Sequence, residues 1–174
     1  KENRAVNELK VDLELNSSIP FNQLIKDLEL IPLETNDSLV IGDIFKIVTD
    51  QDFLYLLDTR FEVVFIFNFE GKGIGKISSM GKGIGEYVRA DDFCLGPLNT
   101  IFILDTIQKK ILQFNRTNLA FIREFRVTFD CVKFETLNDS LFVFFRGLPI
   151  AGEGDKYQIY ITDFDGDIIN KHLD

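Results

Sequence analysis

One phrase of apolar residues, an Asp-Thr pair, a polar turn, more apolar residues and an Asn occurs twice in this chain. The first copy, FLYLLDTRFEVVFIFN, runs from Phe53 to Asn68, and the second, TIFILDTIQKKILQFN, runs from Thr100 to Asn115. Asp105 follows Asp58 by 47 residues, and the two closing asparagines have the same spacing. A period of roughly 40 to 50 residues predicts an array of structural repeats.

Each repeat is divided into short runs that are typical of β-strands. The middle runs are almost continuously apolar and rich in β-branched and aromatic residues, which indicates strands covered on both faces. Asp-containing turns separate the runs, because Asp can hydrogen-bond its own backbone two residues on. The last run of the second repeat alternates polar and apolar residues, as expected at an outer edge. The predicted strands are 44–48, 53–57, 63–67, 73–78, 92–95, 101–104, 110–114, 120–127, 131–135, 141–145, 157–162 and 168–173.

A third, degenerate repeat follows the first two. Its turn Asp163–Gly166 corresponds to Asn68–Gly71 of the first repeat, 95 residues earlier and thus close to two periods. Four-stranded repeats of this length are the signature of β-propeller blades, which stack face to face around a channel. A β-sandwich is the alternative, but it would need no fixed period. We therefore predict an all-β fold of about three blades, each with four antiparallel strands, that is part or half of a six-bladed propeller.

The repeats set the predicted division of the chain. Residues 43–78 form blade 1, residues 79–127 a linker loop and blade 2, and residues 128–174 blade 3. Residues 1–42 hold N-terminal strands, expected over Leu9–Leu15 and Leu24–Leu33, with an outer or ring-closing role. Three blades cannot close a ring, and each terminal blade would leave one apolar face in water. We expect either a missing second half or self-association of two copies.

Composition narrows the classes of partner. A net charge of -9 argues against nucleic acid as a partner, because such binding needs clustered Lys and Arg. No apolar run reaches the ~18 residues that a transmembrane span needs. The sequence starts without Met or a signal peptide, as in a mature form whose targeting segment has been removed. Cys94 and Cys131 lie in apolar stretches without metal-ligand spacing, so we expect both to be reduced and buried.

The segment GKGIGEYVRADDFCLGPLNTIFILDTIQKKILQFN, from Gly81 to Asn115, resembles the NHL-type repeat, with Lys110 where that family usually has Arg. Joined to the preceding LELIPLETNDSLVIGDIFKIVTDQDFLYLLDT, it is similar to six-bladed β-propellers common as exported lipoproteins of Bacteroidetes. The resemblance implies an extracytoplasmic location, in the periplasm or at the outer-membrane surface, and a lipid anchor lost from the sequence. It implies no specific activity.

Two glycine-rich loops, Gly71–Gly75 and Gly81–Gly85, each read GKGIG. A phosphate-binding loop of the dinucleotide or P-loop kind would be followed directly by a helix N-terminus. Strand and turn signals follow here instead. We interpret the glycines as turn and blade-crossing residues.

The candidate site residues are few. Asp43, Asp91, Asp92 and Glu135 lie near the starts of predicted first strands and could converge on the channel, where Asp92 and Glu135 are the candidate ligands for a divalent cation. The alternative is that these carboxylates cap turns. Tyr87, Phe93 and Tyr157 are the candidates for stacking on a sugar or peptide, and the alternative is that they belong to the core between the blades, as Phe and Tyr of a propeller usually do. No catalytic set and no cofactor site is predicted.

The predicted function is a non-enzymatic, extracytoplasmic propeller that binds or scaffolds a protein, peptide or glycan. The alternative is a metal-dependent, lactonase-like hydrolase with a divalent cation in the channel.

Overall fold

The computed structural model describes residues 20, 23, 25–147 and 157–173. The chain divides into two units, Lys1–Leu30 and Ile31–Asp174, and all the named strands belong to the second. The strand predicted over Leu9–Leu15 lies outside the described residues.

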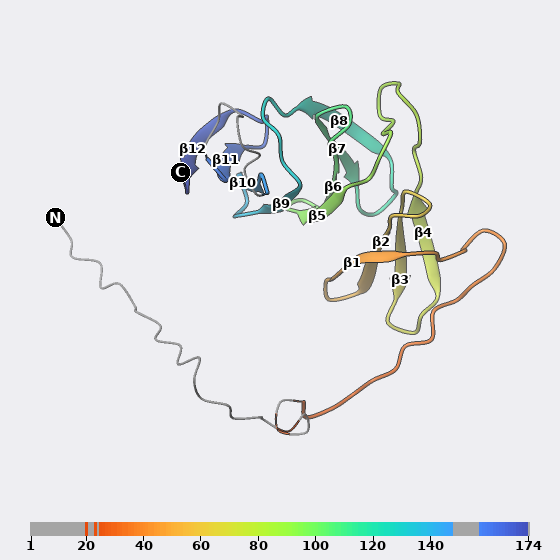
Figure 1. Ribbon diagram of the computed structural model, residues 1–174. Helices are drawn as coiled ribbons and strands as arrows, with labels where there is room; N and C mark the ends of the chain where they lie inside the picture. The colour runs from red at the N-terminus through yellow and green to blue at the C-terminus, as the bar shows by residue number, and fades with distance from the viewer. Residues whose placement is uncertain (1–19, 21–22, 24, 148–156, 174) are drawn as a thin grey trace. The chain divides into compact units, whose positions relative to one another are not determined.

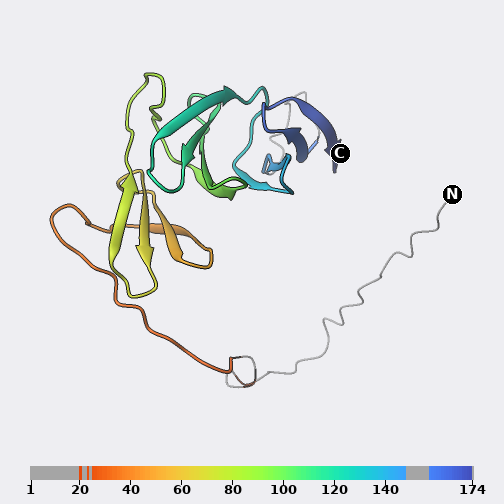
Figure 2. The same ribbon diagram turned by 180° about the vertical axis from the view of Figure 1, so that it is seen from behind.

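The second unit contains three four-stranded antiparallel sheets, each a meander of consecutive strands (Figures 1 and 2). The first sheet, blade 1, has β1 (Ile44–Thr49), β2 (Phe53–Asp58), β3 (Val63–Asn68) and β4 (Gly73–Ile77). Blade 2 has β5 (Asp92–Gly96), β6 (Thr100–Asp105), β7 (Lys110–Asn115) and β8 (Phe121–Arg126). Blade 3 has β9 (Lys133–Thr136), β10 (Leu141–Phe145), β11 (Ile159–Asp163) and β12 (Ile168–His172). The prediction of an all-β fold built from three four-stranded blades of a partial propeller is confirmed.

The blades stack face to face through two apolar clusters. Between blades 1 and 2, Tyr55, Leu57 and Val64 of one sheet meet Phe93 and Ile103 of the other. The blade 2–blade 3 cluster is largely aromatic: its buried members are Cys94, Phe102, Leu104, Ile111, Val127, Phe129, Cys131, Phe134, Phe142, Phe144 and Tyr160. Each fully buried side chain of this size stabilises the fold by about 1.5–3 kcal/mol. Burial on both faces explains why the middle strands are almost wholly apolar.

The repeated Asp and Asn residues tie the turns of each blade. Asn68 Oδ1 accepts hydrogen bonds from the backbone amides two and four residues on, and Asp163 Oδ1 does the same in blade 3. Asn115 holds the corresponding turn of blade 2 through the amides two and three residues on. Asp58 and Asp105 are fully buried, and each joins the turn after its own strand to the segment that enters its blade.

The two cysteines are free and buried, as predicted. Cys94 lies on β5, the first strand of blade 2. Cys131 lies two residues before β9 rather than on it.

Residues 31–42 form a strap over the outward face of blade 1. Leu39 belongs to a buried cluster that includes Phe65 and Phe67, and Leu33 and Ile41 pack against it. The Glu34 amide donates to the Gly71 carbonyl oxygen at 2.8 Å, which places the strap beside the β3–β4 hairpin, where the orange segment of Figure 2 reaches the sheet. The chain that precedes blade 1 therefore covers part of the apolar face that was expected to lie in water, while Ile47 of β1 on the same face is 57% exposed.

The strand predicted over Leu24–Leu33 is absent from its described part, residues 25–33. Leu28 and Leu30 alternate with acidic residues as in a strand, yet they are 75% and 85% exposed. A strand needs a neighbouring strand for its backbone hydrogen bonds. The described part of the chain supplies none to this segment.

Candidate functional site

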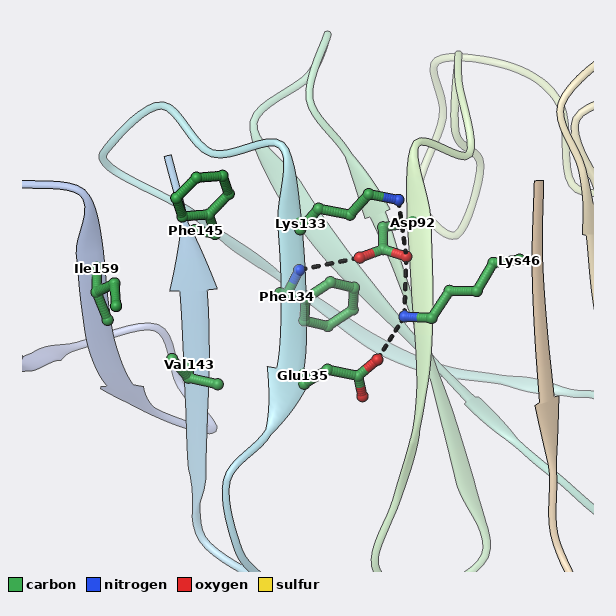
Figure 3. A pocket seen from close by; sticks show the side chains of 8 residues that line it. All are labelled: Lys46, Asp92, Lys133, Phe134, Glu135, Val143, Phe145 and Ile159. Atoms are coloured by element: carbon green, nitrogen blue, oxygen red, sulfur yellow. Dashed lines mark hydrogen bonds and ion pairs between the residues drawn. The ribbon is translucent and has the colours of Figure 1, made fainter. Parts of the chain in front are cut away.

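The first strands of the three blades bring charged side chains together at one place (Figure 3). Lys46 of β1 extends past β5 and reaches β9. Its Nζ donates to Asp92 Oδ1 at 3.0 Å and to Glu135 Oε1 at 2.5 Å. One ammonium group therefore links the inner strands of all three blades. We call Lys46, Asp92, Lys133 and Glu135 the inner-strand cluster.

Asp92 is the buried anchor of this cluster. Its side chain has no exposed surface, and its Oδ2 accepts the backbone N–H of Phe134 at 3.0 Å. The Lys133 ammonium is 3.9 Å from Asp92 Oδ1. Burial by itself would lower the pKa of Lys46, but the hydrogen bonds and charges of Glu135 and Asp92 outweigh it, so that pKa lies above its ordinary value. Lys46 is accordingly held in its charged form.

A pocket of about 210 Å³ adjoins the inner-strand cluster. Val143 and Phe145 of β10 and Ile159 of β11 form its apolar wall, as Figure 3 shows. Lys133 and Glu135 stand on the same face of blade 3, because they pair in register with Phe145 and Val143. The pocket therefore has an apolar wall and a rim that carries both signs of charge.

Phe45 extends this surface on β1. Its side chain is 51% exposed, and the Lys133 ammonium lies 3.7 Å from the centre of its ring. Contacts between an ammonium and an aromatic face are attractive by about 0.5–1 kcal/mol at exposed sites. Residues of blades 1 and 3 thus meet here, beside the pocket.

The two candidate metal ligands, Asp92 and Glu135, do lie close together. However, the Lys46 ammonium lies between them and donates to both carboxylates, and Asp92 also accepts a hydrogen bond from the Phe134 backbone amide. In the described part of the chain, no group of three or more His, Cys, Asp and Glu residues could hold a metal ion. The donor set fits an ammonium group rather than Ca²⁺, which takes six to eight oxygen ligands.

The other two acidic candidates lie at turns. Asp91 Oδ2 accepts the Thr106 amide and hydroxyl at 2.8 and 2.7 Å, and its Oδ1 pairs with Arg89. The Asp43 carbonyl oxygen accepts the Thr59 amide at 3.0 Å. The Asp91 contacts match a turn-capping carboxylate, whereas the Asp43 contact is made by the backbone.

Two of the three candidate stacking residues belong to the core. Tyr87 and Phe93 have no exposed surface, and the Tyr87 hydroxyl is within 2.7 Å of the Glu62 carbonyl oxygen and 3.0 Å of that of Ile77. A ligand therefore cannot stack on either ring in this structure. Tyr157 is half-buried, with the Lys171 ammonium 5.4 Å from the centre of its ring.

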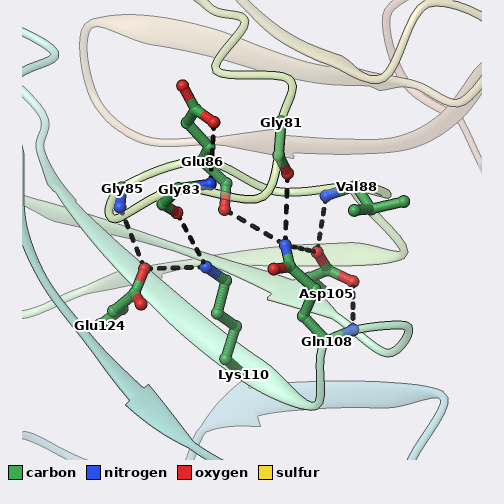
Figure 4. A network of polar contacts seen from close by, with 9 residues as sticks. All are labelled: Gly81, Gly83, Gly85, Glu86, Val88, Asp105, Gln108, Lys110 and Glu124. Carbon is green, nitrogen blue, oxygen red and sulfur yellow. Dashed lines mark hydrogen bonds and ion pairs between the residues drawn. The ribbon is translucent and has the colours of Figure 1, made fainter.

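The second glycine-rich loop is fixed by carboxylates (Figure 4). The Gly83 amide donates to Glu86, and the Gly85 amide donates to Glu124, which also pairs with Lys110 at 2.9 Å. These are the backbone donors that a bound phosphate would need, and side chains of this chain already occupy them. Gly85 also has a positive φ of 75°, as expected at a turn.

Sequence reasoning missed Lys46, Lys133 and Phe45. Lys46 is 46 residues from Asp92 and 89 from Glu135, so no local motif joins them. One signal was available: in a stacked array, the first strands of successive blades line a common channel, and Lys46 is a charged residue in the otherwise apolar first strand of blade 1.

Comparison with known proteins agrees with this architecture. The family model described as Domain of unknown function (DUF4934) matches residues 6–174. A "putative exported protein" of Bacteroides fragilis has a similar structure, with a TM-score of 0.76 and 26% sequence identity over 84% of this chain and 42% of that one. A search of curated proteins found no match.

Two more distant structures share the fold. A protein of unknown function from Bacteroides caccae has a TM-score of 0.53 and 10% identity, over 72% of this chain and 47% of that one. Hydrazine synthase from Kuenenia stuttgartiensis has a TM-score of 0.54 and 12% identity, over 79% and 38%. This chain thus spans less than half the length of each of the three structures. Within the described residues, no helix has the length and apolar character to cross a membrane.

Proposed function

The chain belongs to the DUF4934 family, and from this premise we propose that it is part of an extracytoplasmic β-propeller that binds a protein or peptide segment at its inner strands. The likeness to the exported Bacteroides fragilis protein supports the extracytoplasmic location. The binding role rests on the structure of the inner-strand surface.

The observation that carries the proposal is that blades 1 and 3 form one exposed surface of mixed character, beneath which lies the buried Asp92 of blade 2. The Phe45 side chain of β1 is half exposed beside the Lys133 ammonium of β9, and Glu135, also on β9, is exposed. Lys46 holds the strands that carry this surface in place, because its two ion pairs join β1 to β5 and to β9. An aromatic anchor flanked by charges of both signs suits a polypeptide, which carries apolar side chains and charges of both signs.

The burial of the candidate aromatic rings favours a protein or peptide over a glycan as the ligand. Sugar rings are held by aromatic faces. The structure buries Tyr87 and Phe93 completely, and the Lys133 ammonium lies over the Phe45 ring, 3.7 Å from its centre. Tyr157, half-buried and facing Lys171, is the candidate that keeps some exposure.

The alternative of a metal-dependent hydrolase has no observation in its favour. Its two candidate ligands neutralise Lys46, and freeing them would break a link between the blades. We therefore base the test on binding.

The experiment is a screen of the purified protein on a peptide array and a glycan array, followed by titration of the best peptide. Phe45→Ser combined with Lys133→Ala should weaken peptide binding at least about tenfold, because loss of an interface anchor commonly costs more than 1 kcal/mol. Phe69→Ser is the matched control, since this Phe is similarly exposed but lies in the β3–β4 turn. Equal affinity of both variants, or signals on the glycan array alone, would count against the proposal.

A further inference from the structure

A second pocket lies between the loop Gly81–Gly85 and the last two strands of blade 2, β7 and β8 (Figure 4). Its volume is about 440 Å³, larger than the pocket of about 210 Å³ beside the inner-strand cluster. The two pockets share no lining residue. This second pocket therefore needs an interpretation of its own.

The lining of the second pocket carries three cationic side chains, Lys82, Lys110 and Arg126, but a single carboxylate, Glu124. Lys110 neutralises Glu124 at a distance of 2.9 Å. In the part of the chain that the structure describes, neither Lys82 nor Arg126 forms an ion pair, and both residues are exposed. The pocket thus keeps two uncompensated positive charges, although the net charge of the chain is -9.

Glu124 shows how these charges act on an anion in the pocket. Burial by itself would raise the pKa of Glu124, but the hydrogen bonds from Lys110 and from the Gly85 amide, with the charges of Lys110 and Arg126, outweigh it. The pKa of Glu124 therefore lies below its ordinary value. The surroundings of this carboxylate stabilise negative charge on oxygen.

The loop that carries Lys82 is fixed by its own hydrogen bonds. The Gly83 amide donates to Glu86 at 2.9 Å, and the Gly81 amide donates to the Tyr87 carbonyl oxygen at 2.9 Å. The same pentapeptide at residues 71–75 instead leads into β4, and its lysine, Lys72, does not line this pocket. The place of the loop in the fold, rather than the GKGIG sequence, therefore creates the pocket.

We propose that this pocket binds a phosphate monoester, either a soluble one or a lipid headgroup. Lys82 and Arg126 donate to the phosphate oxygens, because an ammonium and a guanidinium fork both form strong charge-assisted hydrogen bonds with phosphate. A phosphate monoester carries a charge of about -1.5 to -2 at neutral pH, which balances these two cations, whereas a carboxylate balances only one. The amides of Gly83 and Gly85 stay with their carboxylates, so side chains rather than a backbone cradle hold the ligand. Ile84, 85% exposed at the pocket, offers an apolar contact to the organic part of the ester.

Calorimetric titration of the purified protein with phenyl phosphate tests the soluble form of this ligand. We expect saturable binding of one equivalent, weakened at least about tenfold in the double variant Lys82→Ala with Arg126→Ala, which loses two charge-assisted contacts. Lys72→Ala with Arg60→Ala is the matched control. It removes the same two charges from exposed positions that do not line the pocket, so its affinity should equal that of the wild type. Equal weakening in both double variants overturns the proposal, because it would reflect net charge alone.

Vesicles distinguish a lipid headgroup from a soluble ester. Flotation with phosphatidylcholine vesicles that contain phosphatidic acid assigns the headgroup if the wild type and the control float but the Lys82 and Arg126 double variant does not. Binding of phenyl phosphate without flotation assigns a soluble ester, and both results support a phosphate site. Absence of binding in both arms overturns the proposal. Binding of poly-glutamate as tight as that of phenyl phosphate also overturns it, because the pocket would then select any anion.

Discussion

Replacing Lys46 with Met tests whether the inner-strand cluster holds the blades together. The substitution keeps an unbranched apolar side chain up to Cε but removes the ammonium beyond it. Asp92, with no exposed surface, then loses its partner at 3.0 Å, and Glu135 loses the partner that joins it to β1. An unpaired buried carboxylate is costly because water cannot replace the lost charge.

The magnitude follows from the burial of the two partners. Removing one member of a buried ion pair destabilises a protein by about 3–5 kcal/mol. Lys46 is 19% exposed, and Asp92 keeps the Phe134 amide at 3.0 Å and Lys133 at 3.9 Å. We therefore expect a decrease near the lower limit, about 3 kcal/mol in the free energy of unfolding. Adding Asp92→Asn to Lys46→Met should recover part of this loss, because the asparagine leaves no unpaired charge in the buried position.

Urea denaturation of the variants provides the assay. Lys109→Met is the matched control, since Lys109 pairs with Asp130 at 2.6 Å but the two side chains are 55% and 58% exposed. Exposed pairs of this kind contribute about 0–1 kcal/mol. A loss for Lys46→Met no larger than that of the control, or no recovery with Asp92→Asn, would refute the reasoning.

Three further predictions follow from the described contacts. The pKa of Lys46 is higher in the folded than in the unfolded protein, so its contribution to stability is complete below the unfolded-state pKa of about 10.4. That contribution is lost as the pH rises through the folded-state pKa. The free energies of unfolding of the wild type and Lys46→Met should therefore converge above that pH. Gly71→Ala should destabilise the protein by about 1–3 kcal/mol in thermal or urea unfolding. The loss should be clearly larger than for Gly147→Ala, because both glycines have a positive φ but only at Gly71 would the added Cβ collide with backbone atoms. Burial raises the pKa of Cys94 well above its usual range and that of Cys131 to about 12, so a thiol reagent at neutral pH should label both only after denaturation, and fast labelling of the native protein would contradict their burial.

Local patterns made the blades predictable. The 47-residue spacing of Asp58 and Asp105 reflects one turn built twice, because each carboxylate caps the turn beside it. The turn at Asp163 could be assigned to the third repeat for the same reason, and its hydrogen bonds match those of Asn68. Such contacts join residues within a few positions of each other, so the sequence shows them directly.

The inner-strand cluster was only partly predictable. Asp92 and Glu135 were chosen as carboxylates near the starts of first strands, and they do lie together. Their partner Lys46 was missed, and with it the chemistry, because an ammonium between two carboxylates turns a candidate metal site into a cross-link. For Tyr87 and Phe93 the sequence left two alternatives, a stacking site or the core between the blades, because it shows that a residue is aromatic but only the stacking of blades decides whether its ring is buried; both rings lie in the core.

The Lys46–Glu135 contact has a kinetic consequence. All strand pairings join neighbours in the chain, so each blade can form its hairpins by closing short loops. The ion pair between Lys46 and Glu135 joins residues 89 positions apart and requires three blades in place. Such a contact is expected to form after the main folding barrier, and its loss should then accelerate unfolding while leaving the folding rate almost unchanged. The cluster would thus govern how long the stacked blades stay together once formed, rather than how fast they assemble.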